Sequence, residues 1–177
     1  LLGRQEVEAN LDLITKNIKD KVVLITGAGG SIGSEISRQV TKYDAKRIIL
    51  LDSSEYSLYE IKKEIESLTP SMEVDSILAN VTNSRRMIEV CQAFDVDTIY
   101  HTAAYKHVPI VEANPIEGLI NNVISSYVIC KTSELHKPKN VVLISSDKAV
   151  RPTNIMGASK RLSELIFKSF SQKSQEI

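Results

Sequence analysis

The sequence has few of the residues that mark metal-binding or disulfide-rich proteins. Its 177 residues include two cysteines, three histidines and no tryptophan. Cys91 and Cys130 have no second cysteine or histidine at metal-ligand spacing, so we expect no metal site. Both are expected to be reduced thiols packed as small apolar groups, as in a cytoplasmic protein. The sequence also lacks a run of about 18 apolar residues, so we expect no membrane-spanning segment in it.

An excess of charge is absent as well. Lys and Arg together number 22, as do Asp and Glu, so the formal net charge is +0. We therefore expect no nucleic-acid partner. The apolar content of 42% is ordinary for a globular protein, and the length is sufficient for one hydrophobic core. The first residue is not Met and no secretory pattern follows it, so we expect a segment of a longer protein.

Short apolar segments alternate with amphipathic ones along the chain. The apolar segments predict strands at 21–26, 47–51, 74–78, 98–101 and 140–145. The amphipathic segments predict helices at 32–42, 56–68, 84–94, 115–135 and 154–171. This alternation is typical of a parallel sheet covered on both faces. We predict an α/β fold, a Rossmann-like doubly wound parallel sheet, with a C-terminal substrate lobe largely absent.

A glycine-rich turn, TGAGGSIG, joins the first predicted strand to the first predicted helix. Gly27 would permit the tight turn, Gly30 would let the backbone approach a pyrophosphate, and Gly33 would let helix and strand pack closely. The helix begins at Ser31 and Ile32, and its free amide groups would face the phosphates. The position of the turn predicts a dinucleotide site, and the alternative is a glycine-rich turn without a ligand.

A carboxylate follows the second predicted strand. Asp52 can accept hydrogen bonds from ribose hydroxyls and would repel a 2′-phosphate, which favours NAD over NADP. The alternative is a helix-capping Asp in a surface turn. Other cofactor contacts are expected at the strand ends, from Ser53, Asn80, Val81, Ala103 and Ala104. We therefore interpret residues 21–177 as an NAD-binding Rossmann domain and residues 1–20 as a helical lead-in.

An acid and an amine stand side by side after the last predicted strand. Asp147 and Lys148 follow Ser146, and the next helix carries Met156 and Lys160 one turn apart on one face. Such groups at the carboxyl end of a strand could move protons on a sugar while a nicotinamide moves hydride. The alternative is an ordinary solvated turn.

With these residues placed, the sequence resembles the extended short-chain dehydrogenase/reductase superfamily. It is most similar to the nucleotide-sugar 4,6-dehydratases of bacterial polysaccharide biosynthesis, in their CapD-like, long membrane-anchored form. The matching segments are TGAGGSIGSE at 26–35, LLDSSEYSLYEI at 50–61, HTAAYKHVPIVEANP at 101–115 and SSDKAVRPTNIMGASKR at 145–161. Met156 replaces the superfamily's catalytic tyrosine, as in the long forms, and a thioether cannot exchange a proton near neutral pH.

The resemblance implies a lyase that converts UDP-N-acetylglucosamine to a UDP-4-keto-6-deoxy sugar. NAD would take hydride from C4, water would leave across C5 and C6, and hydride would return to C6. We assign Asp147 to proton transfer, including protonation of the departing C6 hydroxyl. Lys148 would remove the C5 proton if its amine loses its proton readily. Ser146, with Ser145 as second choice, would hydrogen-bond the C4 oxygen, and Lys160 would hold the nicotinamide ribose.

Other candidates lie between the fourth and fifth predicted strands. Lys106 and Asn122 are the expected substrate contacts, although Lys106 would also suit plain surface and Asn122 matches a structural asparagine of the superfamily. His101 is interpreted as a packed strand-end residue, and His107 as surface or substrate contact. We expect a homo-oligomer that binds a UDP-sugar at the cytoplasmic face of the inner membrane, anchored by helices outside this segment.

Two other functions remain open from the sequence. A nucleotide-sugar 4-epimerase would share the cofactor half, but it normally needs the tyrosine that Met156 replaces. The chain by itself could also be a non-catalytic NAD-binding module, because a substrate lobe is needed to complete a pocket.

Overall fold

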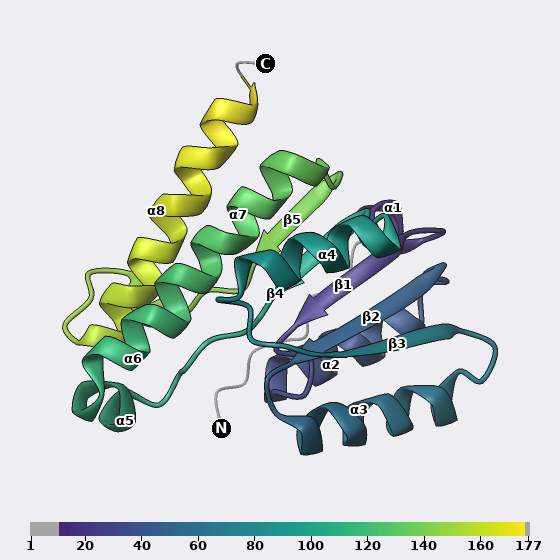
Figure 1. The fold of residues 1–177 in the computed structure, drawn as a ribbon, viewed down its shortest axis with the longest axis horizontal. Helices are drawn as coiled ribbons and strands as arrows, with labels where there is room; N and C mark the ends of the chain where they lie inside the picture. The colour runs from purple at the N-terminus through teal and green to yellow at the C-terminus, as the bar shows by residue number, and fades with distance from the viewer. Residues whose placement is uncertain (1–10, 176–177) are drawn as a thin grey trace.

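The computed structural model describes residues 11–175 and contains a five-stranded parallel sheet (Figure 1). The strands are β1 (Val22–Thr26), β2 (Arg47–Asp52), β3 (Glu73–Leu78), β4 (Thr98–His101) and β5 (Asn140–Leu143). Their order is β3-β2-β1-β4-β5, so the strand order reverses between β1 and β4. This is the doubly wound Rossmann-like sheet predicted from the sequence, and it creates a crevice at the carboxyl ends of β1 and β4.

Helices cover both faces of the sheet (Figure 1). One face carries α1 (Leu11–Ile18), α2 (Ser31–Thr41) and α3 (Glu55–Leu68). The other carries α4 (Ser84–Phe94), α7 (Ser125–His136) and α8 (Ile155–Gln175). Residues 1–10 of the expected lead-in lie outside the described residues. Among those described, no helix is both long and apolar enough to cross a membrane.

The sheet separates two apolar cores because successive side chains of a strand point to opposite faces. The first core, against α1 to α3, is formed by Ile18, Val23, Ile25, Ala28, Val40, Ala45, Ile48, Leu50, Leu58, Ile61 and Ile65. The second core, against α4 and α7, is formed by Val22, Leu24, Ile49, Leu51, Val81, Met87, Val90, Cys91, Val96, Ile99, Val128 and Ile129. Each fully buried aliphatic side chain contributes about 1.5–3 kcal/mol relative to exposure.

The region between β4 and β5 differs from the prediction. The expected loop contains α5 (Val108–Ala113), and the expected single helix is α6 (Pro115–Leu119), a π-helical turn (Ile120–Ile124) and α7. Pro109 suits the first turn of the short α5. The π turn carries one extra residue per hydrogen-bonded ring, which a search for a 3.6-residue period does not detect.

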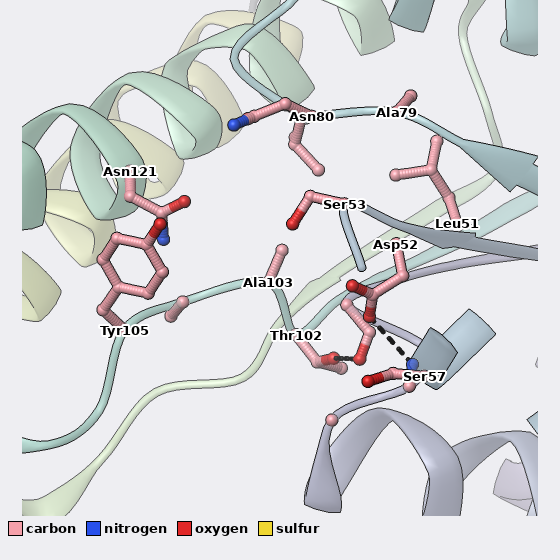
Figure 2. Close-up of a pocket in the computed structure, with 15 residues that line it drawn as sticks. Leu51, Asp52, Ser53, Ser57, Ala79, Asn80, Thr102, Ala103, Tyr105 and Asn121 are labelled. Carbon is pink, nitrogen blue, oxygen red and sulfur yellow. Dashed lines mark hydrogen bonds between the residues drawn. The ribbon is translucent and has the colours of Figure 1, made fainter. Parts of the chain in front are cut away.

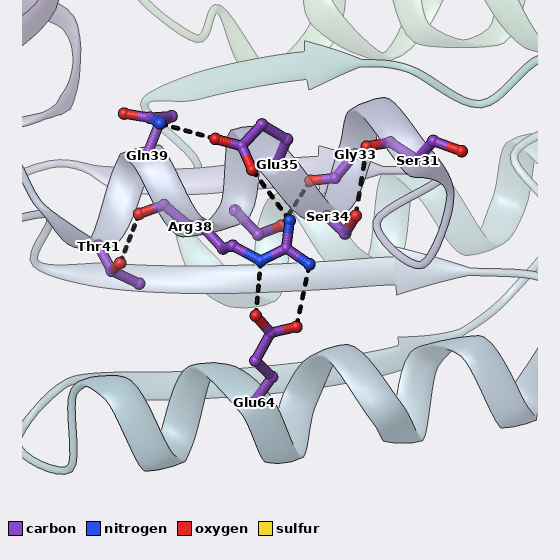
Figure 3. A network of polar contacts seen from close by, with 9 residues as sticks. Ser31, Gly33, Ser34, Glu35, Arg38, Gln39, Thr41 and Glu64 are labelled. Atoms are coloured by element: carbon purple, nitrogen blue, oxygen red, sulfur yellow. Dashed lines mark hydrogen bonds and ion pairs between the residues drawn. The ribbon is translucent and has the colours of Figure 1, made fainter.

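A polar network fastens α2 to α3 (Figure 3). The Arg38 guanidinium donates from Nε and Nη2 to both carboxylate oxygens of Glu64, at 2.5 and 3.1 Å, and from Nη1 to Glu35 at 2.9 Å. The hydrogen bond from Arg38 lowers the pKa of Glu64. These side chains are partly exposed, so the network adds little stability but fixes how α2 lies on α3.

We expect Lys137→Gly to stabilise the fold. Lys137 ends α7 in the left-handed region, at φ 49° and ψ 51°, where a side chain is unfavourable and glycine is not. The free energy of unfolding should rise by roughly 1 kcal/mol, measured by urea unfolding at unchanged m-value. Lys131→Gly, inside the same helix, is the matched control and should lower it by about 1 kcal/mol. A less stable Lys137→Gly variant would contradict the backbone assignment.

Candidate active site

A groove follows the crevice at the carboxyl edge of the sheet and consists of two adjoining pockets. The first has a volume of about 220 Å³ and the second about 440 Å³. They share Gly27, Gly30, Thr102, Ala104 and Tyr105. In the first pocket, Asp52, Ser53 and Asn80 lie on one side and Tyr105 with Asn121 on the other (Figure 2).

The glycine turn is built so tightly that side chains are excluded at specific positions. Gly27 has a φ of +68°, and a Cβ there would lie 2.7 Å from the Ala103 backbone. A Cβ at Gly33 would lie 2.0 Å from the Gly27 carbonyl oxygen. At Gly30 the nearest atom would be that same oxygen at 3.2 Å, so this position is open to the groove. The sequence analysis missed Gly29, where a Cβ would meet the Ser57 Cβ at 2.4 Å.

The N-terminus of α2 faces the second pocket. Gly30 is its N-cap and provides no side-chain cap, so the first amides of the helix are available to an anion. Ser31 and Ile32 line this pocket together with Lys106. Lys106 Nζ donates to Ser31 Oγ at 3.1 Å, which sets its positive charge beside the glycine turn. Lys106 therefore lies at the glycine turn, and its role as a substrate contact stays a prediction.

Asp52 is held by backbone amides rather than capping a helix. Its Oδ2 accepts from Gly29 N and its Oδ1 from Ser54 N, both at 2.9 Å. The N-cap of α3 is Ser54, which accepts from Ser57 N, so the helix-capping alternative for Asp52 is wrong. Each carboxylate oxygen keeps a lone pair for a ribose hydroxyl. Asn80, beside it, commits its side-chain oxygen to the backbone and hydroxyl of Thr82.

A buried histidine ends β4, directly before Thr102, which lines both pockets. His101 is 1% exposed; its Nδ1 lies 2.8 Å from Thr26 Oγ1, and its Nε2 lies 3.3 Å from Ser126 Oγ and 3.4 Å from Ser125 Oγ. Burial, and then the positive charge of Lys160, lower the pKa of His101 to about 3. The ring is neutral at physiological pH, which confirms the interpretation of His101 as a packed strand-end residue.

Asn122 lies in the π turn and is fully occupied by internal hydrogen bonds. Its Oδ1 accepts from Tyr105 N at 2.7 Å and from Asn121 Nδ2 at 3.1 Å. Its Nδ2 donates to Tyr105 O at 3.0 Å and to Ser159 Oγ at 2.9 Å. The side chain is 1% exposed and its amide has no further donor or acceptor capacity. The expectation of a substrate contact is therefore wrong: Asn122 fastens the wall of the groove to α8.

The acid–amine pair lies on a short 3₁₀ helix (Asp147–Ala149) after β5, exposed to solvent. Asp147 Oδ1 accepts from Ser146 Oγ at 3.0 Å and from Lys148 Nζ at 3.4 Å. The hydrogen bond from Ser146 and then the charge of Lys148 lower the pKa of Asp147. Asp147 is thus a carboxylate at neutral pH. The Lys148 side chain is 50% exposed, so it is not buried in this structure.

Helix α8 carries the remaining candidates. Met156 is 3% exposed, and its assignment to the catalytic group stays a prediction. Lys160 is 7% exposed and its Nζ donates to Ile144 O at 2.6 Å. Burial lowers the pKa of Lys160, and the nearby carboxylate of Glu164 partly opposes this.

The two pockets contain the predicted cofactor residues except Lys160, together with the predicted substrate contact Lys106, whereas the predicted catalytic residues lie outside them. Those that line a pocket are Gly27, Gly30, Ser31, Ile32, Gly33, Asp52, Ser53, Asn80, Val81, Ala103, Ala104 and Lys106. Those that line neither are Asn122, Ser146, Asp147, Lys148, Met156 and Lys160. The sequence analysis missed Thr102 and Tyr105, although both stand next to the two predicted alanines.

The chain is similar to known proteins of polysaccharide biosynthesis and to enzymes that act on nucleotide sugars. The chain is 42% identical to the capsular polysaccharide biosynthesis protein CapD of Staphylococcus aureus, over 97% of the chain and 29% of that protein. It is 32% identical to a UDP-N-acetylglucosamine 4,6-dehydratase (inverting) of Campylobacter jejuni, over 83% of the chain and 42% of that enzyme. It thus spans less than half of these relatives.

A solved structure and a family description extend the comparison. The UDP-glucose 4-epimerase of Bifidobacterium longum, in complex with NAD+ and UDP, superposes with a TM-score of 0.73 at 25% identity, over 84% of this chain and 48% of that one. The family described as "Polysaccharide biosynthesis protein" matches residues 23–177. The chain therefore belongs to the polysaccharide biosynthesis protein family.

Proposed function

We propose that the chain is the NAD-binding half of a UDP-N-acetylglucosamine 4,6-dehydratase, a lyase of bacterial polysaccharide biosynthesis. Residues 21–177 would form the NAD-binding domain of that longer enzyme. One observation carries the proposal: the glycine groove at the β1/β4 crevice lies in the same sheet edge as the Asp147–Lys148 pair, which follows the neighbouring β5. The similarity to CapD and to the Campylobacter dehydratase supports it.

The residues of the groove fit NAD. The turn is open to the groove at Gly30, where a Cβ would meet only Gly27 O at 3.2 Å, and the uncapped start of α2 suits a pyrophosphate. Asp52 has lone pairs for the ribose hydroxyls and would repel the 2′-phosphate of NADP. NAD, when bound, supplies hydride acceptance and return. The protein's part is to hold it and to move protons on the sugar.

The proposed proton chemistry belongs to the exposed turn. Asp147 is a carboxylate on an exposed turn outside the two pockets, so it must gain a proton before it can give one to the departing C6 hydroxyl. A sugar bound over the turn would remove water from Asp147, and desolvation favours the neutral acid. The proton that Asp147 gains would come from the Lys148 ammonium, whose Nζ lies 3.4 Å from Asp147 Oδ1. The neutral Lys148 amine would then take the C5 proton, and Ser146, released from its bond to Asp147, would donate to the C4 oxygen.

We further propose that the enzyme acts as a homo-oligomer at the cytoplasmic face of the membrane, on a UDP-sugar made in the cytoplasm. Cys91 and Cys130 are buried free thiols, which suits a reducing compartment. Burial raises the pKa of Cys91 to about 11 and that of Cys130 to about 12, so neither is a reactive thiolate.

Product analysis tests the proposed function. The full-length protein is incubated with UDP-N-acetylglucosamine in deuterated water and followed by NMR. A dehydratase gives a 4-keto-6-deoxy sugar, and the proposal predicts this product. Formation of UDP-N-acetylgalactosamine instead would identify a 4-epimerase, and an unchanged substrate with NAD bound would identify a non-catalytic module.

We expect Lys106→Ala to weaken NAD binding by roughly tenfold, because it removes a charge-assisted hydrogen bond at the pyrophosphate. Lys106→Arg should retain most of the affinity. The measurement is NAD titration by calorimetry, at fixed ionic strength because the contact is exposed. Lys63→Ala, which removes an exposed lysine from α3, is the matched control. A changed KM for UDP-sugar with unchanged NAD affinity would indicate that Lys106 contacts the substrate and not NAD.

A further inference from the structure

Helix α8 packs against and hydrogen-bonds to the segment that carries the acid–amine pair. We call residues 145–148 the reacting turn. Gly157, Lys160 and Glu164 occupy successive turns on one face of α8, and each meets the reacting turn or the residue before it. The position of Asp147 relative to α8 is therefore set by contacts along this face.

Two of these contacts involve backbone atoms. A Cβ at Gly157 would lie 2.3 Å from the carbonyl oxygen of Lys148, so the helix approaches the turn as closely as a residue without a side chain allows. Lys160 Nζ donates to Ile144 O at 2.6 Å, at the end of β5. Neither contact fixes a side chain of the reacting turn.

The third contact does fix a side chain. Ser145 Oγ donates to Glu164 Oε1 at 2.6 Å, and the other carboxylate oxygen of Glu164 accepts from Arg161 at 2.9 Å. A serine hydroxyl has one proton to donate, and here Ser145 donates it to the Glu164 carboxylate. Ser145 therefore cannot donate to a substrate oxygen in this arrangement, and Ser146, whose hydroxyl donates to Asp147 Oδ1 at 3.0 Å, can do so only when that bond is released.

We propose that Glu164 is a positioning residue of the dehydration: by accepting the hydroxyl proton of Ser145, it holds the reacting turn at a fixed place on α8. The role in turnover rests on the proposed function, whereas the role in holding the turn does not. The bond is short, and Glu164 lies in the middle of the 21-residue α8. The negative charge also lies one helical turn from Lys160 and favours its ammonium form.

Turnover by the full-length protein tests the role in catalysis. Glu164→Ala and Ser145→Ala should each lower kcat roughly tenfold, with little change in KM or NAD affinity. The double variant should be no worse than either single variant, because both remove the same bond. Glu164→Gln keeps an acceptor for Ser145 and should restore most of kcat. Arg161→Ala, which removes only the exposed partner of Glu164, is the control and should match the wild type.

Hydrogen exchange tests the positioning itself, whatever reaction the protein performs. The amides of Ala149 and Val150 bond to Ser146 O and Asp147 O. They should exchange faster in Glu164→Ala and keep the wild-type rate in Arg161→Ala. Unchanged exchange, or a loss of kcat in Ser145→Ala without one in Glu164→Ala, would overturn the inference. A wild-type protein that makes no 4-keto product would instead refute the proposed function. The hydrogen-exchange result would then still decide whether Glu164 positions the turn.

Discussion

We expect Asp147→Asn in the full-length protein to lower kcat for dehydration by about 10²–10⁴-fold, the usual contribution of a positioned general acid or base. The amide fits the space of the carboxylate and can accept a hydrogen bond from Ser146, but it cannot carry a proton to the C6 oxygen. NAD affinity should stay unchanged, because Asp147 lines neither pocket of the groove. The measurements are single-turnover formation of the 4-keto sugar and NAD titration.

The control for this variant is Asp44→Asn, which makes the same change at an exposed residue before β2. Asp44 has a φ of 53°, a conformation that asparagine tolerates well. Lys148→Ala is the companion variant and should stop exchange of the C5 hydrogen with solvent. Full turnover by Asp147→Asn would remove Asp147 from the mechanism, and continued exchange in Lys148→Ala would require another base.

The second large effect is expected at the glycine turn. Gly33→Ala would set a methyl group 2.0 Å from Gly27 O, 2.8 Å from Gly27 C and 2.8 Å from Thr102 Oγ1. The first two are backbone atoms, so β1 and α2 must move apart. We expect the free energy of unfolding to fall by about 3 kcal/mol. NAD affinity should fall by roughly a hundredfold, since the start of α2 is displaced.

Gly30→Ala is the matched variant that separates packing from binding. Its methyl group would meet only Gly27 O, at 3.2 Å, so thermal unfolding should change little. The same methyl group would point into the groove and obstruct a pyrophosphate, so NAD affinity should still fall. Equal NAD affinity in Gly30→Ala and the wild type would show that the dinucleotide does not pass over the glycine turn.

The fold was predictable because its central strands β1 and β2 are continuous apolar runs between clear breaks. Ile48 to Leu51 are all fully buried, which is what such a run in a parallel sheet requires. Asn83, a residue type favoured at helix N-caps, caps α4 and accepts from Arg86 N at 3.1 Å. The π turn could not be predicted from the sequence, because one extra residue changes the phase of a helix without changing its composition.

The sequence predicted the position of a site residue where its residue type and its place in the chain allow only one role. Gly27, Gly33 and Asp52 lie where the spacing predicts, because backbone clashes and a strand end define their positions. Asn122 was misassigned because its partners, the Tyr105 backbone and Ser159, are distant in sequence. Tertiary contacts of this kind leave no local signal, and the sequence alone could not distinguish a buried amide from one that faces a substrate.

The two cores differ in when they can form during synthesis. Every buried member of the first core lies between Ile18 and Ile65, whereas the second core needs residues as far along the chain as Ile129. A nascent chain that has left the ribosome through β3 can therefore complete the first core alone, with the opposite face of β1 and β2 still bare. That bare apolar face would be the natural target of a chaperone until α4 and α7 arrive.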